Sequence, residues 1–401
     1  MDLHSSDTFG LLKNGLLFDY PSLHHDEKAD VAIVGAGITG SLVAWYLCKK
    51  GFDVVIVDKR HVGTGSTAAS TSLVQYEIDT PLVKLRHDIG EQNAVASYKL
   101  CIDAIYELEA ICNKIRVSPH FQRKQSIQFA STEKHLQQLR EEFVFRKKYG
   151  IQVNWLSRAD LDAKTTLTAP GAILSRDAAQ VDAYRLTHGL LHMLSGKGLR
   201  IFDNTCIDKI TRSGKQIILT SHEGIRVRAK HLVIACGYES QKYIPKKIEE
   251  TQSTYAIVSE CYPQREELWY KNCLLWETAM PYRYLRVTHD NRIMIGGKDE
   301  KFYNPTRRNK HLPAKAKALE KSFSSLFPEI PFKRDFQWAG TFSSTKDGLP
   351  YIGSIRQRPM TSFALGFGGN GITFSVIAAQ VICNALLGKP HRHASLFSFD
   401  R

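Results

Sequence analysis

The chain has 401 residues, of which 43% are hydrophobic, so it is long enough to build two domains around sizeable cores. No uninterrupted run of about eighteen apolar residues occurs, and the first five residues lack the basic and apolar regions of a secretory signal. We therefore expect a cytoplasmic protein without a membrane-spanning helix. The eight cysteines are scattered and form no Cys-x-x-Cys pair, so we expect no metal site and no redox dithiol.

The formal net charge of +14 is typical of a lysine-rich surface, although it would also attract an acidic substrate or RNA. The densest basic stretch consists of Arg307, Arg308, Lys310, Lys315, Lys317 and Lys321. It contains no interleaved aromatic residues and no recognisable RNA-binding motif. Nucleic acid is therefore a minor hypothesis.

The first predicted elements form a strand–helix–strand unit. Residues 31–34 (Val-Ala-Ile-Val) have the length and branching of a buried parallel strand. The pattern of residues 38–50 predicts a helix, and Gly51 is placed to end it. Residues 54–57 (Val-Val-Ile-Val) predict a second buried strand, which ends at Asp58.

The turn of this unit carries the motif Gly35-x-Gly37-x-x-Gly40. Gly35 allows a tight turn, Gly37 lets backbone approach a pyrophosphate, and Gly40 lets the helix pack close to the strand. The helix N-terminus offers free N–H groups to phosphates, and Asp58 can accept hydrogen bonds from a ribose diol. The unit predicts a bound dinucleotide, and the acidic Asp58 disfavours the 2′-phosphate of NADP.

The middle of the chain alternates between predicted helices and strands. A loop of small residues at 63–72 carries six Ser and Thr hydroxyls, which favours contact with a ligand over a plain linker. Helical spacing of apolar residues predicts helices over 95–112, 132–149 and 182–195. Short strands are predicted at 216–221, 224–228 and 231–237, and alternating, aromatic-rich sequence up to Gly297 is typical of antiparallel sheet.

A second glycine motif lies near the end of the chain. A predicted strand at 362–365 leads into Gly366-Phe367-Gly368-Gly369-Asn370-Gly371, which opens a predicted helix over 372–387. Only thirty residues remain after the motif, and no partner strand with a terminal acid follows, so a second nucleotide-binding unit is excluded. A helix N-terminus of this kind fits a flavin, because its dipole stabilises the negative charge of the reduced ring.

Taken together, these motifs resemble the FAD-dependent D-amino-acid oxidase superfamily, which includes glycine oxidase, sarcosine oxidase and glutamylputrescine oxidase. The resemblance covers most of the chain. It rests on Gly35-x-Gly37-x-x-Gly40 with Asp58, Gly65-Ser66-Thr67, the strand ending Ala235-Cys236-Gly237, Trp338-Ala339-Gly340 with residues 345–353, and Gly368-Gly369-Asn370-Gly371-Ile372.

The resemblance implies an α/β fold with a Rossmann-like domain that holds FAD noncovalently, formed by residues 1–80, 165–237 and 335–401. It implies a second, α+β domain, formed by residues 81–164 and 238–334, whose mixed and antiparallel sheet covers the flavin. The implied cofactor-binding residues are Gly35, Gly37, Ile38, Thr39, Gly40, Asp58, Lys59, Arg60, Gly65, Ser66, Thr67, Ile207, Ala235, Cys236, Gly237, Gly340, Gly368, Gly369, Asn370, Gly371 and Ile372.

The implied reaction is the oxidation of a C–N bond in a small amine or amino acid. Hydride passes to flavin N5, water hydrolyses the imine, and O₂ or another acceptor takes the electrons. Members that bind an amino-acid carboxylate place an arginine two residues after the Trp-x-Gly glycine, where this chain has Phe342. An apolar ring cannot pair with a carboxylate, so either the substrate has none at that spot or another cation replaces the arginine.

Four residues are expected to act on the substrate. Tyr282, Tyr284 and Arg286 alternate along a predicted strand, so they share one face, which lies either toward the flavin or toward solvent. We expect Arg286 or Arg283 to bind an anionic group and Tyr284 to hydrogen-bond the substrate. Gln75 and Tyr76 follow the small-residue loop and could fix the amine or tune the flavin, although a cap or a surface contact is as plausible for each.

Other functions remain open at this point. A flavin-dependent tRNA-modification oxidoreductase acting on an aminomethylated base is the main alternative, which the basic charge favours and the lack of a separate nucleic-acid-binding module opposes. A flavoprotein without turnover is another. An NAD-linked dehydrogenase is the least favoured, because the C-terminal glycine motif would then have no purpose. The sequence leaves the substrate, the electron acceptor and the oligomeric state undecided.

Overall fold

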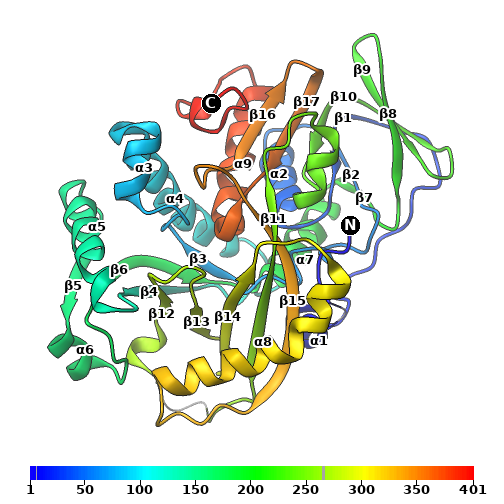
Figure 1. Cartoon of the computed structure of the whole chain (residues 1–401). Helices are drawn as coiled ribbons and strands as arrows, with labels where there is room; N and C mark the ends of the chain where they lie inside the picture. Colours follow the sequence, from blue (N-terminus) through cyan, green and yellow to red (C-terminus); the bar gives the residue numbers. More distant parts are fainter. Residues whose placement is uncertain (6, 264–266) are drawn as a thin grey trace.

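Two β-sheets dominate the computed structural model, which describes residues 1–5, 7–263 and 267–401 (Figure 1). Within these residues the first sheet has eight strands, in the order β16-β17-β10-β1-β2-β7, with β9 paired to β10 and β8 to β9. Its members are β1 (Glu27–Val34), β2 (Val54–Val57), β7 (Arg200–Phe202), β8 (Ile207–Ser213), β9 (Gln216–Ser221), β10 (Arg226–Ile234), β16 (Tyr351–Ile355) and β17 (Arg358–Leu365). The strands β17, β10, β1, β2 and β7 run parallel, as expected of a Rossmann-like core.

The second sheet is mixed and mostly antiparallel, in the order β15-β11-β14-β13-β12-β4-β6-β3, with β5 paired to β6. Its members are β3 (Leu73–Gln75), β4 (Gln122–Phe129), β5 (Val153–Ser157), β6 (Gly171–Gln180), β11 (Glu250–Ser259), β12 (Leu274–Glu277), β13 (Tyr284–Val287), β14 (Ile293–Glu300) and β15 (Arg334–Ser344). Among the pairings described in this second sheet, only that of β12 with β4 is parallel. This mixed α/β architecture with two sheets agrees with the predicted fold class.

Helices pack on both sheets. They are α1 (Phe9–Asn14), α2 (Ile38–Lys49), α3 (Leu82–Ile89), α4 (Glu91–Cys112), α5 (Leu136–Lys148), α6 (Arg158–Lys164), α7 (Ala183–Ser195), α8 (Pro305–Leu326) and α9 (Gly371–Leu386). Short 3₁₀ turns are η1 (Glu133–His135), η2 (Gly237–Tyr243), η3 (Tyr270–Asn272), η4 (Gly368–Asn370) and η5 (Ala394–Phe397). The yellow helix α8 lies along the second sheet in Figure 1, and its apolar residues pack with Tyr255, Leu285 and Ile295 of that sheet.

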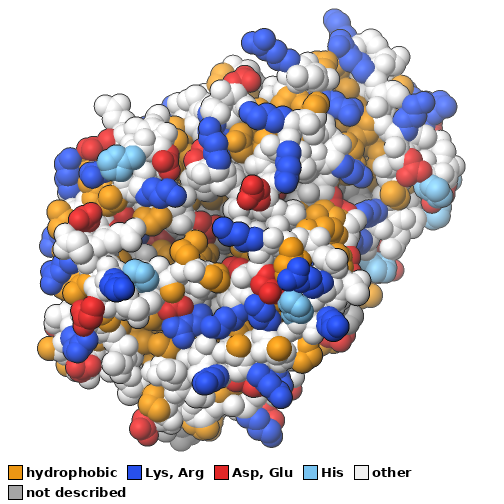
Figure 2. Space-filling model, viewed as in Figure 1, with side chains coloured by type: hydrophobic (Ala, Val, Ile, Leu, Met, Phe, Trp, Pro, Cys, Tyr) orange, Lys and Arg blue, Asp and Glu red, His pale blue; other side chains and the backbone are white. Residues whose placement is uncertain are grey.

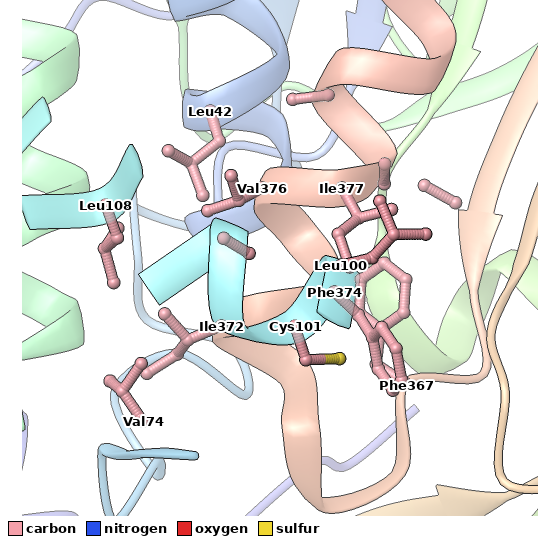
Figure 3. Packing of buried hydrophobic residues seen from close by; sticks show 14 of the residues in the cluster. Leu42, Val74, Leu100, Cys101, Leu108, Phe367, Ile372, Phe374, Val376 and Ile377 are labelled. Carbon is pink, nitrogen blue, oxygen red and sulfur yellow. The ribbon is translucent and has the colours of Figure 1, made fainter. Parts of the chain in front are cut away.

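The main core lies between the first sheet and the helices α2, α4, α7 and α9. Figure 3 shows Leu42 of α2, Leu108 of α4 and Val376 of α9 among its side chains. The strand β1 is buried on both faces, because Val31 and Ile33 belong to this core while Ala32 and Val34 belong to the core on the opposite side. This explains the continuous apolar run at residues 31–34, where a half-exposed strand would alternate.

Some predicted elements need correction. The two strands predicted at 224–228 and 231–237 are one strand, β10, because Lys230 interrupts the apolar pattern without breaking the ladder. Its ammonium group lies 2.8 Å from Asp30 of the neighbouring strand β1. The helix α3, which carries four polar or charged residues in eight, was not predicted.

Sheet membership crosses the predicted domain limits. The strands β3, β6 and β15 were assigned to the cofactor domain, yet each pairs within the second sheet. The division of the chain into two domains stays a prediction. If sheet membership defines the domains, β3, β6 and β15 belong to the second domain and not to the cofactor domain.

One helical segment, Gly368–Leu386, has the length and the apolar character of a membrane span, with a mean hydropathy of 1.3. It was not expected from the sequence, because polar residues such as Ser375 interrupt its apolar run. The fold buries 67% of its most apolar stretch, and α9 packs against α2 and α4. The burial identifies it as a core helix of this fold.

Candidate functional site

A cavity with an empty volume of about 1980 Å³, including its open mouth, lies between the two sheets. It begins at the carboxyl ends of β1, β2, β10 and β17, where parallel α/β sheets bind ligands, and it reaches β11, β13, β14 and β15 of the second sheet. Of the cavities described it is by far the largest, and it holds almost all the predicted site residues.

The turn after β1 has the geometry that the glycine motif predicts. Gly35 has a φ of +113°, and a Cβ on this residue would lie 2.7 Å from the carbonyl carbon of Ala235. A Cβ on Gly40 would collide with the carbonyl group of Gly35, so the first turn of α2 packs directly on the end of β1. Any other residue at these two positions would separate the helix from the strand.

Asp58 lies at the end of β2 and is held by the backbone. Its Oδ2 accepts a hydrogen bond from the Ala36 amide at 2.6 Å, and its Oδ1 accepts one from the Arg60 amide at 2.9 Å. Burial raises the pKa of Asp58, and the two amide hydrogen bonds oppose this rise. The carboxylate lines the cavity, where its remaining lone pairs can accept hydrogen bonds from a diol.

A cluster of charges surrounds this end of the cavity. Glu239 of η2 accepts hydrogen bonds from Lys59 at 2.6 Å, from Arg60 at 2.9 Å and from the N-terminal ammonium of Met1 at 2.8 Å. Although burial opposes it, these hydrogen bonds lower the pKa of Glu239 to about 2. Of these cations, Lys59 and Arg60 line the cavity, and Glu239 already neutralises part of their charge.

The small-residue loop lies against the N-terminus of α2. The Thr67 hydroxyl accepts a hydrogen bond from the Ile38 amide at 3.1 Å, and Gly65, Ser66 and Thr67 line the cavity. Trp338 of β15 donates its indole N–H to the Ala69 carbonyl at 3.0 Å. The loop is thus fixed between the two sheets, as a ligand-contacting loop would be.

The C-terminal glycine motif turns the start of α9 toward the cavity. Gly368 has a φ of +54°, and the Gly369 amide donates to Oδ2 of Asp79 at 2.8 Å. The Asn370 side chain points away from the cavity and donates to the carbonyl groups of Gln75 and Glu77. Asn370 therefore fixes the segment after β3 against the helix start, and it does not line the cavity.

Tyrosines line the end of the cavity that faces the second sheet. The Tyr284 ring lies flat across the neighbouring strand, because the residue beside it is Gly296, where a Cβ would lie 2.5 Å from the ring atom Cε2. The Tyr282 and Tyr284 ring centres are 5.9 Å apart, and the Tyr282 hydroxyl donates to Asp79 at 2.8 Å. Tyr238, Phe342 and Asp299 complete this part of the lining.

The two arginines predicted to bind an anion lie outside the lining. Arg283 forms a paired contact with Glu277, 2.5 Å from Nε to Oε1 and 2.6 Å from Nη2 to Oε2, so its guanidinium is already neutralised. Arg286 is 6% exposed and donates through Nε to the Thr71 carbonyl at 2.6 Å. Burial lowers the pKa of Arg286 to about 10.

Most predicted site residues converge on the cavity. Those that line it are Gly35, Gly37, Ile38, Thr39, Asp58, Lys59, Arg60, Gly65, Ser66, Thr67, Gln75, Ile207, Ala235, Cys236, Gly237, Tyr284, Gly340, Gly368, Gly369, Gly371 and Ile372. Gly40, Tyr76, Arg286 and Asn370 do not. Tyr76 is fully buried in the main core, and its hydroxyl is paired with Ser175 at 2.9 Å.

Several lining residues were not predicted. They include Tyr238, Glu239, Lys242, Thr254 and Asp299. Asp299 follows the paired glycines of β14, and that position near Tyr284 is the one signal in the sequence that could have found it. The others come from segments that only the pairing of β10, β11 and β14 brings together.

No metal site was expected from the sequence. Outside the cavity, Asp19, His61 and Asp203 bring potential ligand atoms within 4.8 Å of one another. His61 Nδ1 lies 3.1 Å from Asp203 Oδ2, which is the distance of an ordinary hydrogen bond. This group carries no assignment.

The lining fits an extended dinucleotide. The collision of a Gly35 Cβ with Ala235 marks a place for close backbone approach, and α2 directs its N-terminus at the same point. The start of α9 faces the other end of the cavity, where the flat Tyr284 ring and Gly340 leave room for a planar ring system. Two helix N-termini thus meet one continuous cavity.

Comparisons with known proteins agree with this geometry. The model of one protein family, described as FAD dependent oxidoreductase (DAO), matches residues 30–385. The glycine oxidase of Geobacillus kaustophilus is 25% identical over 89% of this chain and 92% of its own length. The gamma-glutamylputrescine oxidoreductase of Escherichia coli is 21% identical over 93% of this chain and 87% of its own. The crystal structure of the Geobacillus kaustophilus glycine oxidase has a TM-score of 0.76 at 20% identity, covering 91% of this chain and 96% of that one.

Proposed function

The chain belongs to the FAD dependent oxidoreductase (DAO) family, and from that premise we propose that it oxidises a C–N bond in a small amine. The chain is an enzyme of this family and its cofactor is FAD. Relatives are named for glycine, for gamma-glutamylputrescine and for D-amino acids, all of which carry an amine or a substituted amine. These names support the class of reaction and leave the substrate open.

The residues that would hold FAD are those that line the long cavity. We assign the pyrophosphate to the N-terminus of α2 with Gly35 and Gly37, and the adenosine ribose to Asp58. The flavin ring would lie between the start of α9 and the tyrosines of the second sheet. When bound there, FAD supplies the acceptor for hydride and passes the electrons on to O₂ or to another acceptor.

Tyr284 would orient the substrate as a hydrogen-bond donor. Burial, with the nearby charge of Asp299, raises the pKa of Tyr284 to about 12, so its hydroxyl keeps its proton at neutral pH. Gln75 lines the same cavity, and its backbone carbonyl accepts hydrogen bonds from the Asn370 side chain at 3.1 Å and the Thr373 hydroxyl at 3.2 Å. The tyrosine rings and Phe342 would exclude water from the reacting carbon.

The observation that carries the proposal is the apolar Phe342 in the cavity wall. It lies on β15, paired with Gln252 of β11, at the position where the resemblance expects a carboxylate-binding arginine in amino-acid oxidases. Neither Arg283 nor Arg286 lines the cavity. We therefore favour an amine without a carboxylate beside the reacting nitrogen over an α-amino acid.

The test is a visible absorption spectrum of the purified protein, followed by anaerobic titration with simple amines, diamines, N-methyl amino acids and D-amino acids. We expect a bound flavin whose absorption bleaches with amines and not with the amino acids. If only the amino acids bleach it, the preference for amines is wrong. If none of the compounds does, C–N oxidation itself is in doubt.

A flavin-dependent tRNA-modification reaction is the second candidate, and the net charge of +14 is what favours it. Lysine and arginine side chains lie across the whole face shown in Figure 2, with acidic side chains among them. The densest basic stretch is less exposed than its sequence suggests, because Arg308 is buried and Lys315 lies 3.3 Å from Glu300. Retention on RNA at low salt that is lost steeply as salt rises would support this candidate.

A further inference from the structure

The charged groups that line the cavity are divided between its two ends. Among the described residues the lining cations are Lys59, Arg60 and Lys242, and all three lie near Glu239 at the nucleotide end. The end that faces the second sheet is lined by no cation in this part of the chain. Its charged lining residue is Asp299.

Asp299 carries a buried carboxylate oxygen that a ligand in the cavity could contact. Its Oδ1 atom is buried and makes no hydrogen bond within the described residues, and no ion pair with Asp299 occurs there. Its contact is a neutral one, the hydroxyl of Thr254, and a carboxylate without a cation in the wall of a cavity is costly unless a ligand supplies the missing charge or proton. Asp299 lies at the end of β14, three residues after Gly296, beside the Tyr284 ring.

Two more carboxylates stand behind the tyrosines. Asp79 accepts a hydrogen bond from the Tyr282 hydroxyl, and Glu249 accepts one from Ser343. Burial, with the nearby charge of Glu249, raises the pKa of Tyr238. Neither carboxylate forms an ion pair among the described residues. This end of the cavity therefore combines negative charge with the faces of aromatic rings, which is the combination that binds organic cations.

We propose that Asp299, with the rings of Tyr282 and Tyr284, forms a subsite for a positively charged nitrogen of the substrate. The inference rests on the proposed amine oxidation and names its substrate class. An amine must be neutral at the nitrogen beside the carbon that loses hydride, so the cation held by Asp299 is a second nitrogen. The substrate class is thus an amine that carries a separate ammonium or methylated ammonium group.

The subsite can be tested by binding alone, without turnover. Three small compounds, each with at least three methyl groups on one central atom, differ in charge: tetramethylammonium is a cation, pivalate is an anion and tert-butanol is neutral. Tetramethylammonium has no lone pair on nitrogen, so we expect no oxidation. In calorimetric titrations of the FAD-loaded protein at pH 8, we expect tetramethylammonium to bind most tightly of the three and pivalate not to bind.

Variants locate the binding. Asp299→Asn is expected to weaken the binding of tetramethylammonium by about tenfold or more and to leave the affinity for tert-butanol unchanged, because the substitution removes the charge of the side chain and keeps its shape. Asp299→Glu keeps the charge and should retain measurable cation binding. The matched control is Asp162→Asn, a change at an exposed residue of α6 that should alter nothing.

Two results would overturn the subsite: pivalate binding as tightly as tetramethylammonium, or an unchanged affinity for tetramethylammonium in Asp299→Asn. These results are independent of the proposed reaction. Bleaching of the flavin by a simple monoamine together with failed cation binding would leave amine oxidation standing and remove only the subsite. Cation binding without bleaching by any of the amines or amino acids would remove the reaction and leave the cation site standing.

Discussion

Phe342 and Asp299 lie in the same cavity wall, and together they oppose an anionic substrate group. The first provides no positive charge, and the second repels a carboxylate. Because the cavity excludes much of the water, a single charge changes affinity there more than on an exposed surface. The selectivity of this end should therefore respond to substitutions at either residue.

Phe342→Arg is the direct test of this view. The new guanidinium would add a positive charge to the cavity wall that also holds Asp299, across the intervening strand β11. We therefore expect tetramethylammonium to bind about tenfold more weakly and pivalate to become a detectable ligand in the same titrations. Phe342→Met, which keeps a large and neutral side chain, is the control and should keep the original order of the three ligand affinities. Unaltered affinities for both ions in Phe342→Arg would place the residue away from the bound cation.

Cation binding should depend on pH through Asp299. Burial raises the pKa of Asp299 to about 6, and the charge of Asp79 adds to the rise while Thr254 of β11 and Lys315 of α8 oppose it. Tyr284 faces it from β13 and stays neutral. Since only the carboxylate attracts a cation, affinity for tetramethylammonium should be full at pH 8 and fall as pH drops through about 6. A flat profile between pH 5 and pH 8 would contradict this, and tert-butanol should show a flat profile as the control.

The burial of Glu249 should make the stability of the folded state depend on pH. It is 3% exposed, its Oε1 atom has no hydrogen-bond partner among the described residues, and burial raises its pKa to about 7. A carboxyl group whose pKa is raised by folding stabilises the folded state when protonated, and that contribution is lost as pH rises from about 4.5 through 7. Glu249→Gln should therefore raise the Tm by a few degrees at pH 8 and change it little at pH 5. An equal shift at both values would show that the charge is not responsible.

At the scale of elements, the contact between α2 and the end of β1 depends on Gly40. Gly40→Ala places a methyl group against the Gly35 carbonyl, so the helix must move away from the turn that would hold the pyrophosphate. We expect the purified variant to retain less than about half of the FAD of the parent, measured as the ratio of 450 nm to 280 nm absorbance. Gly196→Ala is the control, because that residue has a helical φ of −64° and its nearest neighbour would be 3.7 Å from the new Cβ. Full FAD retention in Gly40→Ala would mean that the packing tolerates the displacement.

Elements with strong local patterns were predictable from the sequence. The β1-α2-β2 unit and the helix α9 combine continuous apolar runs with glycines at fixed spacing. The bounds of α2, β2 and α9 agree with prediction to within a residue, whereas β1 begins at Glu27, four residues earlier than predicted. The helix α3 was missed because it is short and mixes four apolar residues with four polar or charged ones. Asp299 and Glu249 were missed as site residues for a different reason: their surroundings are created by β11, β14 and β15, which are distant in sequence, and no local pattern reports on such pairing.

The partners of Arg283 and Arg286 likewise could not be predicted from the sequence. Alternation along β13 correctly placed Tyr284 and Arg286 on one face of the sheet, away from the core under α8. It could not reveal that the Thr71 carbonyl engages Arg286, or that Glu277 engages Arg283. The face of a strand follows from its period, whereas the partner of a side chain follows from the tertiary fold.

At the scale of the whole molecule, the cavity joins the two sheets. Val34 of β1 and the residues directly after β2 and β10 line one end, and residues of β11, β13 and β14 line the other. The loop 63–72 and the N-terminal segment contact both, since Leu3 and Ser5 pair with the backbone of β15 while Met1 binds Glu239. A ligand that fills this cavity would therefore stabilise both sheets at once.

Removal of FAD should lower the Tm of the whole chain. A ligand that binds only the folded state stabilises it by about 2.7 kcal/mol at a concentration one hundred times its Kd. We expect FAD added back to the apoprotein to raise a single unfolding transition in a concentration-dependent way, followed by differential scanning fluorimetry. ADP and riboflavin, each of which matches one end of the cavity, should raise it less than FAD when added alone. If FAD instead splits the transition and stabilises only part of the chain, the cofactor does not bridge the two sheets, and the tyrosine-lined end lies too far from the flavin to hold its substrate.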